Sequence, residues 1–180
     1  MENKINYQEI LDRFKYEDES DIKDRIASTT KTNYRENRDI INEIILWKMN
    51  RMPHFDDELI DMIYSLGDID TSGNTIKSDK TKQVLVKLLQ ARGMKLPMAS
   101  TVLHFYFPQV FPIIDQRAYR ELYGIEYPQY VKLDVMVDMY MKYIEDTWKY
   151  QREKCPEIPY EKIDKILYQL DKEKGNKVIY

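Results

Sequence analysis

Apolar residues recur every three or four positions along most of the chain, which is the spacing of an amphipathic helix. Residues 36–49 show the pattern most plainly, with Ile40, Ile41, Ile44 and Trp47 at helical intervals. The same pattern predicts further helices over residues 5–14, 55–66, 78–91, 97–106, 113–123, 129–150 and 160–172. Five glycines are too few for the tight turns of an all-β fold. The sequence therefore predicts an all-α protein with roughly eight or nine helices.

Turn-forming residues separate these predicted helices. The stretch 67–74, GDIDTSGN, is the clearest turn cluster. Gly93 interrupts the apolar pattern, and Pro97 suits the first turn of the helix that follows it. Gly124 predicts another helix end, and residues 154–159 form a linker with two prolines.

Composition limits the classes of protein that need to be considered. The 180 residues are 43% apolar and 33% charged, which suits a single unit with a real core. No apolar run approaches the roughly 20 residues of a membrane helix, and the first residues lack the apolar centre of a signal peptide. We therefore expect a cytoplasmic monomer without membrane contact. The single cysteine, Cys155, excludes an intrachain disulfide and a cysteine-ligated cluster.

Charge is unevenly distributed along the chain. The net charge is −3, which argues against unselective coating of nucleic acid. Residues 77–95 nevertheless carry six basic residues against the single acid Asp79, a local charge of +5. Such a run is either a solvated face or a surface for phosphates. The basic residues are Lys77, Lys80, Lys82, Lys87, Arg92 and Lys95.

Residues 88–124 carry the most chemical information. Their pattern predicts a helix, a tight turn at Gly93, a second helix, and an extended piece that ends at Asp115. Backbone N–H groups at the start of the second helix can hold a phosphate. Asp115 follows the apolar run FPII and precedes a helix, where the helix N-terminus favours its negative charge. Arg117 and Arg120 follow one turn later and could pair with Asp115, lowering its pKa, or contact phosphate.

This segment resembles the helix–hairpin–helix DNA glycosylase superfamily. In that superfamily a hairpin of the type L-P-G-V-G-x-x-x-A precedes a Pro-x-x-Asp run. Here residues 92–99, RGMKLPMA, correspond to the hairpin, and residues 111–115, FPIID, correspond to the aspartate run. Asp115 lies 16 residues after Ala99, which is the spacing of the superfamily. The resemblance covers residues 85–123 best, and the chain resembles uncharacterised bacterial members most.

The chain departs from the superfamily pattern at three places. Lys95 replaces the second hairpin glycine, and Ala91–Arg92 replace the leading Leu-Pro. Pro97 stands where bifunctional members carry their catalytic lysine, so the resemblance implies a monofunctional enzyme. It implies no catalytic metal and no redox cofactor. Relatives bind a monovalent cation through hairpin carbonyl groups, and Lys95 alters that site.

The resemblance also implies roles for individual acids. Asp115 would stabilise the cationic sugar that forms when an N-glycosidic bond breaks, and would orient water. The alternative is a helix N-cap without chemistry. Glu43 corresponds loosely to the acid that protonates the leaving base in adenine glycosylases. The alternative for Glu43 is a solvated residue on an amphipathic helix.

Other residues are candidates for contacts with DNA. The target base must leave the duplex, which costs roughly a few kcal/mol. Trp47 and Lys48 are candidates for the base pocket or wedge, with core burial and a solvated face as their alternatives. His104, between Leu103 and Phe105, is more typical of a hydrogen-bonded core residue than of a catalyst. The candidates for binding the DNA backbone are Lys87, Arg92, Gly93, Met94, Lys95 and Arg117.

Together these observations predict a two-lobed, all-α glycosylase unit over residues 1–180. Residues 35–125 would form the central lobe with the hairpin at 92–96, and residues 1–30 and 126–180 the second lobe. The predicted function is release of a damaged or modified base from double-stranded DNA with a flipped base. The main alternative is a non-catalytic module that binds nucleic acid or protein with the same fold. A helical interaction protein without a nucleic-acid role is the third hypothesis.

Overall fold

The computed structural model describes residues 19–49, 52–68 and 79–178, and this part of the chain is helical, without strands. The prediction of an all-α protein is therefore confirmed. The chain divides into two compact units, residues 1–52 and 53–180. The boundary falls inside the range predicted as the central lobe. The predicted helix at 5–14 and most of the turn cluster at 67–74 lie outside the described residues.

The first unit contains two described helices, α2 (Ser20–Ser28) and α3 (Tyr34–Lys48). The Asn33 side chain caps α3 by accepting a hydrogen bond from the Glu36 N–H. Ile22 and Ile40 are buried. Arg25 binds Glu36 and Glu43 of α3 through its guanidinium, so an ion-pair cluster joins the two helices.

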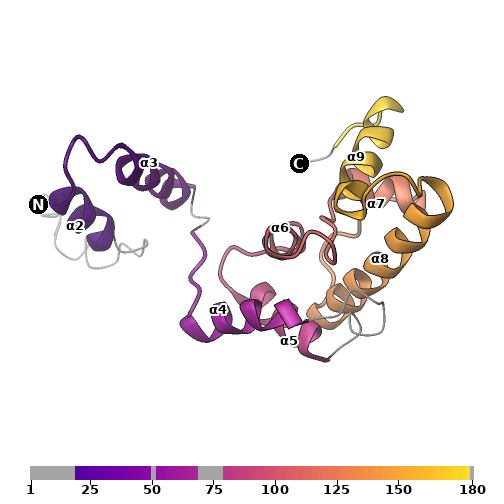
Figure 1. Ribbon diagram of the computed structural model, residues 1–180, viewed down its shortest axis with the longest axis horizontal. Helices are drawn as coiled ribbons and strands as arrows, with labels where there is room; N and C mark the ends of the chain where they lie inside the picture. Colours follow the sequence, from indigo (N-terminus) through magenta and orange to yellow (C-terminus); the bar gives the residue numbers. More distant parts are fainter. Residues whose placement is uncertain (1–18, 50–51, 69–78, 179–180) are drawn as a thin grey trace, which may run out of the picture. The chain divides into compact units, whose positions relative to one another are not determined.

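The second unit holds the remaining described helices in chain order (Figure 1). They are α4 (Asp57–Tyr64), the short 3-10 helix η1 (Ser65–Asp68), α5 (Asp79–Gln90), α6 (Leu96–Tyr106), α7 (Gln116–Tyr123), α8 (Leu133–Lys154), the 3-10 helix η2 (Tyr160–Lys162) and α9 (Ile163–Glu173). Helix α5 packs against α4, α6 and α8, and α7 packs against α8 and most extensively against α9.

The observed helices depart from the predicted ones most clearly at α2, at the start of α7 and at both ends of α8. Helix α2 was not predicted from the sequence. The helix predicted at 113–123 begins only at Gln116, because Asp115 has an extended backbone and is the N-cap, and residues 112–114 have no regular secondary structure. Helix α8 was predicted over 129–150 and runs from Leu133 to Lys154. It ends before Cys155 because Pro156 disfavours helical backbone at the residue that precedes it.

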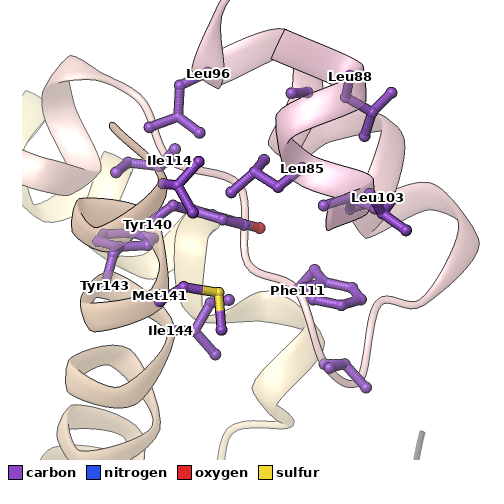
Figure 2. Close-up of a cluster of buried hydrophobic side chains, with 14 of the residues drawn as sticks. Leu85, Leu88, Leu96, Leu103, Phe111, Ile114, Tyr140, Met141, Tyr143 and Ile144 are labelled. Carbon is purple, nitrogen blue, oxygen red and sulfur yellow. The ribbon is translucent and has the colours of Figure 1, made fainter. Parts of the chain in front are cut away.

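The core of the second unit lies between the α5–α6 hairpin and α8 (Figure 2). Apolar side chains from both hairpin helices and from α8 surround the extended run between α6 and α7. Phe111 and Ile114 of this run are completely buried, so the run lies in the core and not on the surface. The largest completely buried side chains include Leu85, Leu88, Leu96, Leu103, Tyr140, Tyr143 and Ile144.

A buried ion-pair network joins α7 to α9. Asp171 is completely buried and accepts two hydrogen bonds from Arg120, from Nε at 2.8 Å to Oδ1 and from Nη2 at 2.8 Å to Oδ2. Arg117 Nη1 donates to the same carboxylate at 3.1 Å and to the Asn176 carbonyl at 2.9 Å. Hydrogen bonding to Arg120 is the main cause that lowers the pKa of Asp171 to about 2. The helices are thus held together by a carboxylate with two guanidinium partners.

We predict that Asp171→Asn destabilises the protein by about 3 kcal/mol at pH 7, because two arginines lose their buried counter-charge. The pKa of Asp171 is lowered by folding, so its contribution is complete above about pH 4 and is lost as the pH falls towards 2. Urea denaturation from pH 2 to 7 measures this difference. Glu126→Gln is the control, because this exposed partner of Arg120 should contribute less than about 1 kcal/mol. Equal effects of the two substitutions would contradict the prediction.

Candidate functional site

The predicted helical hairpin is present. Helices α5 and α6 are joined by residues 91–95, and Gly93 has a φ of 76°, a left-handed conformation that glycine adopts without strain. The Met94 N–H donates to the Ala91 carbonyl at 3.1 Å, which closes the turn. Lys95 is the N-cap of α6 and makes no side-chain capping hydrogen bond, and Pro97 lies in the first turn. The helix therefore begins at the turn with backbone N–H groups that no side chain caps.

Side chains from two helices bind the backbone of the buried run Phe111–Ile114. His104 Nδ1 lies 2.8 Å from the Phe111 carbonyl, and because a carbonyl only accepts, Nδ1 carries the hydrogen. The Tyr140 hydroxyl donates to the Pro112 carbonyl at 2.9 Å, and the Tyr143 hydroxyl donates to the Ile113 carbonyl at 3.1 Å. These bonds replace the partners that a helix or sheet would supply.

Ser100 connects this run to the hairpin. The Ile114 N–H donates to Ser100 Oγ at 3.2 Å, and Ser100 Oγ donates to the Pro97 carbonyl at 2.9 Å. Ser100 is completely buried in α6. The backbone immediately before Asp115 is thereby tied to the first turn of the second hairpin helix. The structure thus brings the hairpin and Asp115 together in one unit.

Asp115 is the N-cap of α7, and its Oδ1 accepts a hydrogen bond from the Ala118 N–H at 2.8 Å. The side chain is partly buried. Burial raises the pKa of Asp115 above its usual value and outweighs the backbone N–H groups of Ala118 and Arg117, which lower it. The guanidinium groups of Arg117 and Arg120 bind Asp171, so within the described residues the expected ion pairs go to Asp171 in place of Asp115. The charge of Arg117 nevertheless lowers the pKa of Asp115, although burial outweighs it.

The candidates for binding the DNA backbone divide by exposure. Arg92, Gly93 and Lys95 are exposed at the turn, whereas Met94 is buried beneath it. Arg117 is only 14% exposed at its side chain and is engaged by Asp171, so its role at a phosphate stays a prediction. The structure thus exposes the turn itself as the basic surface.

Much of the positive charge of residues 79–87 is paired within the second unit. Lys87 of α5 binds Glu58 of α4, and Lys82 binds Asp138 of α8 at 3.1 Å. Lys80 donates to the Ser65 carbonyl. The local charge of +5 over residues 77–95 does not include these acids, because they belong to other helices. Acids of α4 and α8 therefore balance part of the charge of this run.

Glu43, Trp47 and Lys48 lie in α3 of the first unit, whereas Asp115 lies in the second. Glu43 accepts a hydrogen bond from Arg25, and its side chain is 23% exposed. Trp47 is partly buried and Lys48 is exposed. Their assignment to an acid and a base pocket stays a prediction.

An apolar hollow of about 330 Å³ opens beside the hairpin. It lies against the first turns of α6, and its lining is almost entirely apolar. Such a surface next to exposed basic residues suits a ligand that has both an apolar and an anionic part. The lining residues are Pro53, Phe55, Met94, Pro97, Met98, Thr101 and Val102.

Sequence reasoning did not identify several residues that shape this site. The sequence assigned no role to Tyr140 or Tyr143 within the predicted helix 129–150, yet both bind the run before Asp115. Asp164 of α9 is buried, and its charge contributes to raising the pKa of Asp115. The sequence gives little indication that Asp164 is special, because an acid near a helix N-terminus is common on protein surfaces. His104 is 8% exposed, as expected for a core histidine with a hydrogen bond.

Comparison of the chain with protein-family models, with curated proteins and with solved structures gave no match. Within the described ranges, no three His, Cys, Asp or Glu residues are grouped so that they could hold a metal ion. Among the described helices, none is long and apolar enough to cross a membrane. The geometry of the site is therefore the basis for a functional proposal.

We predict that Tyr140→Phe destabilises the protein by about 2 kcal/mol, because the buried Pro112 carbonyl loses its donor. Thermal and urea unfolding measure this loss. The control is Tyr130→Phe, since Tyr130 is fully exposed and its hydroxyl is in water, and it should change stability by less than about 0.5 kcal/mol. A Tyr140→Phe protein as stable as the wild type would show that the extended run does not depend on this bond.

Proposed function

We propose that this protein is a monofunctional DNA glycosylase with the two-lobed helix–hairpin–helix fold, and that it hydrolyses the N-glycosidic bond of a damaged or modified base. The observation that carries the proposal is the placement of Asp115. It is a partly buried carboxylate at a helix N-terminus, and Ser100 ties its backbone to a hairpin whose turn exposes basic residues. That combination joins a group that can stabilise a sugar cation to a surface that can hold a phosphate.

Asp115 is suited to the hydrolysis of an N-glycosidic bond because hydrogen bonds hold its carboxylate and the backbone before it in place. In the proposed step the bond between C1′ and the base nitrogen breaks, the base keeps the bonding electrons, and C1′ becomes cationic. A carboxylate fixed nearby stabilises that charge without reorganising, and water then adds to C1′ to leave an abasic site. The Ala118 N–H and the hydrogen-bonded run before Asp115 restrict the carboxylate to one orientation. The water loses its proton during addition, and Asp115 can accept it.

The hairpin supports the DNA side of the proposal. Arg92 and Lys95 are exposed on either side of Gly93, next to uncapped N–H groups of α6. Backbone N–H groups and basic side chains together are the usual partners of a DNA phosphate. Glu43 remains the proposed proton donor to the leaving base, and Trp47 and Lys48 remain proposed contacts of the flipped base. A monovalent cation at the turn is likewise a proposal.

We predict that the wild-type protein releases a base from at least one substrate in a panel of deaminated, oxidised, alkylated and hypermodified duplexes. Mass spectrometry identifies the base, and alkaline cleavage detects the abasic site. Asp115→Asn should lower the rate by at least about 100-fold, because it removes the charge that stabilises the sugar cation. Burial raises the pKa of Asp115, so the rate should fall on the acid side at a higher pH than for an ordinary aspartate.

The control for this experiment is Asp134→Asn, which removes an exposed acid from the first turn of α8. It should leave base release unchanged. Release by Asp115→Asn at the wild-type rate would contradict the role of Asp115. No release across the panel, with DNA binding retained, would favour the non-catalytic binding module.

We predict that Arg92→Ala and Lys95→Ala each weaken binding of duplex DNA uniformly across sequences. Each removes one phosphate contact and should reduce the slope of log affinity against log salt by about one. Fluorescence anisotropy between 50 and 200 mM salt measures the slope. Lys149→Ala, which removes an exposed cation from α8, is the control. An unchanged slope in both hairpin variants would show that the turn does not contact the backbone.

A further inference from the structure

Helices α7 and α9 pack side by side (Figure 1). The order of the contacts between them shows that they run in the same direction. Their contacts advance together along both helices. The Arg117 guanidinium lies over the Tyr168 ring, 5.4 Å from its centroid, and one turn later Glu121 binds Lys174 at 2.7 Å. The beginnings of the two helices therefore lie at the same end. Asp115 caps the first helix there, and Asp164 lies in the first turn of the second.

Asp164 is an unusual acid because it is buried and, among the described residues, has no ion-pair partner. The residue is 6% exposed, and its buried Oδ1 has no hydrogen-bond partner among the described residues. By contrast, the other buried acid of α9, Asp171, binds two arginines. An ionised carboxylate in such surroundings is costly unless a nearby group stabilises it or a proton neutralises it.

Charged groups from three helices act on the two carboxyl groups. His104 of α6 favours the ionised form of Asp164, as do its neighbour Lys165 and nearby backbone N–H groups. Arg117 of α7 favours the ionised form of Asp115, although its guanidinium binds Asp171. Burial opposes these effects and raises the pKa of each carboxyl group. The charge of Asp164 raises the pKa of Asp115 further.

The tyrosines around the two acids do not compensate their charge. Tyr140 and Tyr143 of α8 donate to backbone carbonyl groups, and Tyr160 of η2 bonds with the Thr147 hydroxyl. Burial raises the pKa of all three phenols, so they stay neutral at physiological pH. The two carboxyl groups therefore lie at the same end of α7 and α9, and the charge of Asp164 opposes the ionisation of Asp115.

We propose that the partly buried Asp115 and the buried Asp164 form one acid pair, which retains a single proton over part of the acidic range. Asp164 is then a positioning residue, because its charge sets the pH at which Asp115 becomes a carboxylate. Its consequence for catalysis rests on the proposed function, whereas the pairing itself does not. Two interacting carboxyl groups lose their protons in two steps that belong to the pair. The second step occurs at a higher pH than either group would show alone.

If the role of Asp164 were purely structural, its replacement would have a different effect on the titration of Asp115. If Asp164 only supported the first turn of α9, its replacement would change stability and leave the titration of Asp115 where it was. In a coupled pair, each group must shift the other by the same amount, because the coupling free energy is reciprocal. The measurement must therefore show whether each carboxyl group shifts the pKa of the other by the same amount.

The test is a titration of the full chain labelled with ¹³C at aspartate carboxyl groups, followed by NMR from pH 2 to 8. In the wild type, the Asp115 and Asp164 signals should each follow a two-step curve with shared midpoints. Asp164→Asn should lower the midpoint of Asp115 by about one pH unit, and Asp115→Asn should lower that of Asp164 equally. Asp134→Asn, the exposed control in the first turn of α8, should move neither midpoint.

Single-step curves with separate midpoints in the wild type would overturn the pairing, and this measurement requires no variant to fold. An unmoved Asp115 midpoint in folded Asp164→Asn protein would overturn it too. If base release is found, its acid limb should move to lower pH by the same unit in Asp164→Asn. Reciprocal shifts without any base release would support the pair and contradict the glycosylase proposal. Base release with an acid limb unaltered by Asp164→Asn would contradict the pair alone.

Discussion

The second unit depends on how the backbone of Phe111–Ile114 is satisfied inside the core. The run has no regular secondary structure, and Phe111 and Ile114 are completely buried. Unpaired backbone groups there would cost several kcal/mol in total. His104, Tyr140, Tyr143 and Ser100 supply the hydrogen bonds in order along the run. This requirement explains why polar side chains interrupt the apolar faces of α6 and α8.

The same bonds place the candidate catalytic residue. Because four side chains fix the backbone up to Ile114, the next residue has little freedom, and Asp115 meets the N-terminus of α7. Helix α7 is then held against α9 by Asp171 and its two arginines. Consequently α9 brings a second acid, Asp164, to the same end as Asp115. The site is therefore a product of packing between segments about 50 residues apart.

The conformation of the hairpin, unlike the position of Asp115, is determined by residues that are neighbours in the sequence. Gly93 allows the left-handed turn, and Pro97 begins a helix without needing an N–H partner. The lysines that precede it form a basic run in the sequence, but Lys82 and Lys87 pair with acids of α8 and α4. Arg92 and Lys95 are exposed at the turn, whereas acids of α4 and α8 balance part of the charge of the run before it. Charge along a sequence thus overstates charge on a surface.

The sequence by itself determined what depends on neighbouring residues. Apolar spacing located most described helices, Gly93 and Gly124 located turns, and the position of Asp115 before α7 predicted its N-cap. These features arise from backbone geometry and capping within a few residues. Only the tertiary structure decided the partners of Arg117, the donors to the buried run, and the placement of Asp164. Those contacts join residues far apart in the chain, and no local pattern specifies which burial and which counter-charge a side chain meets after packing.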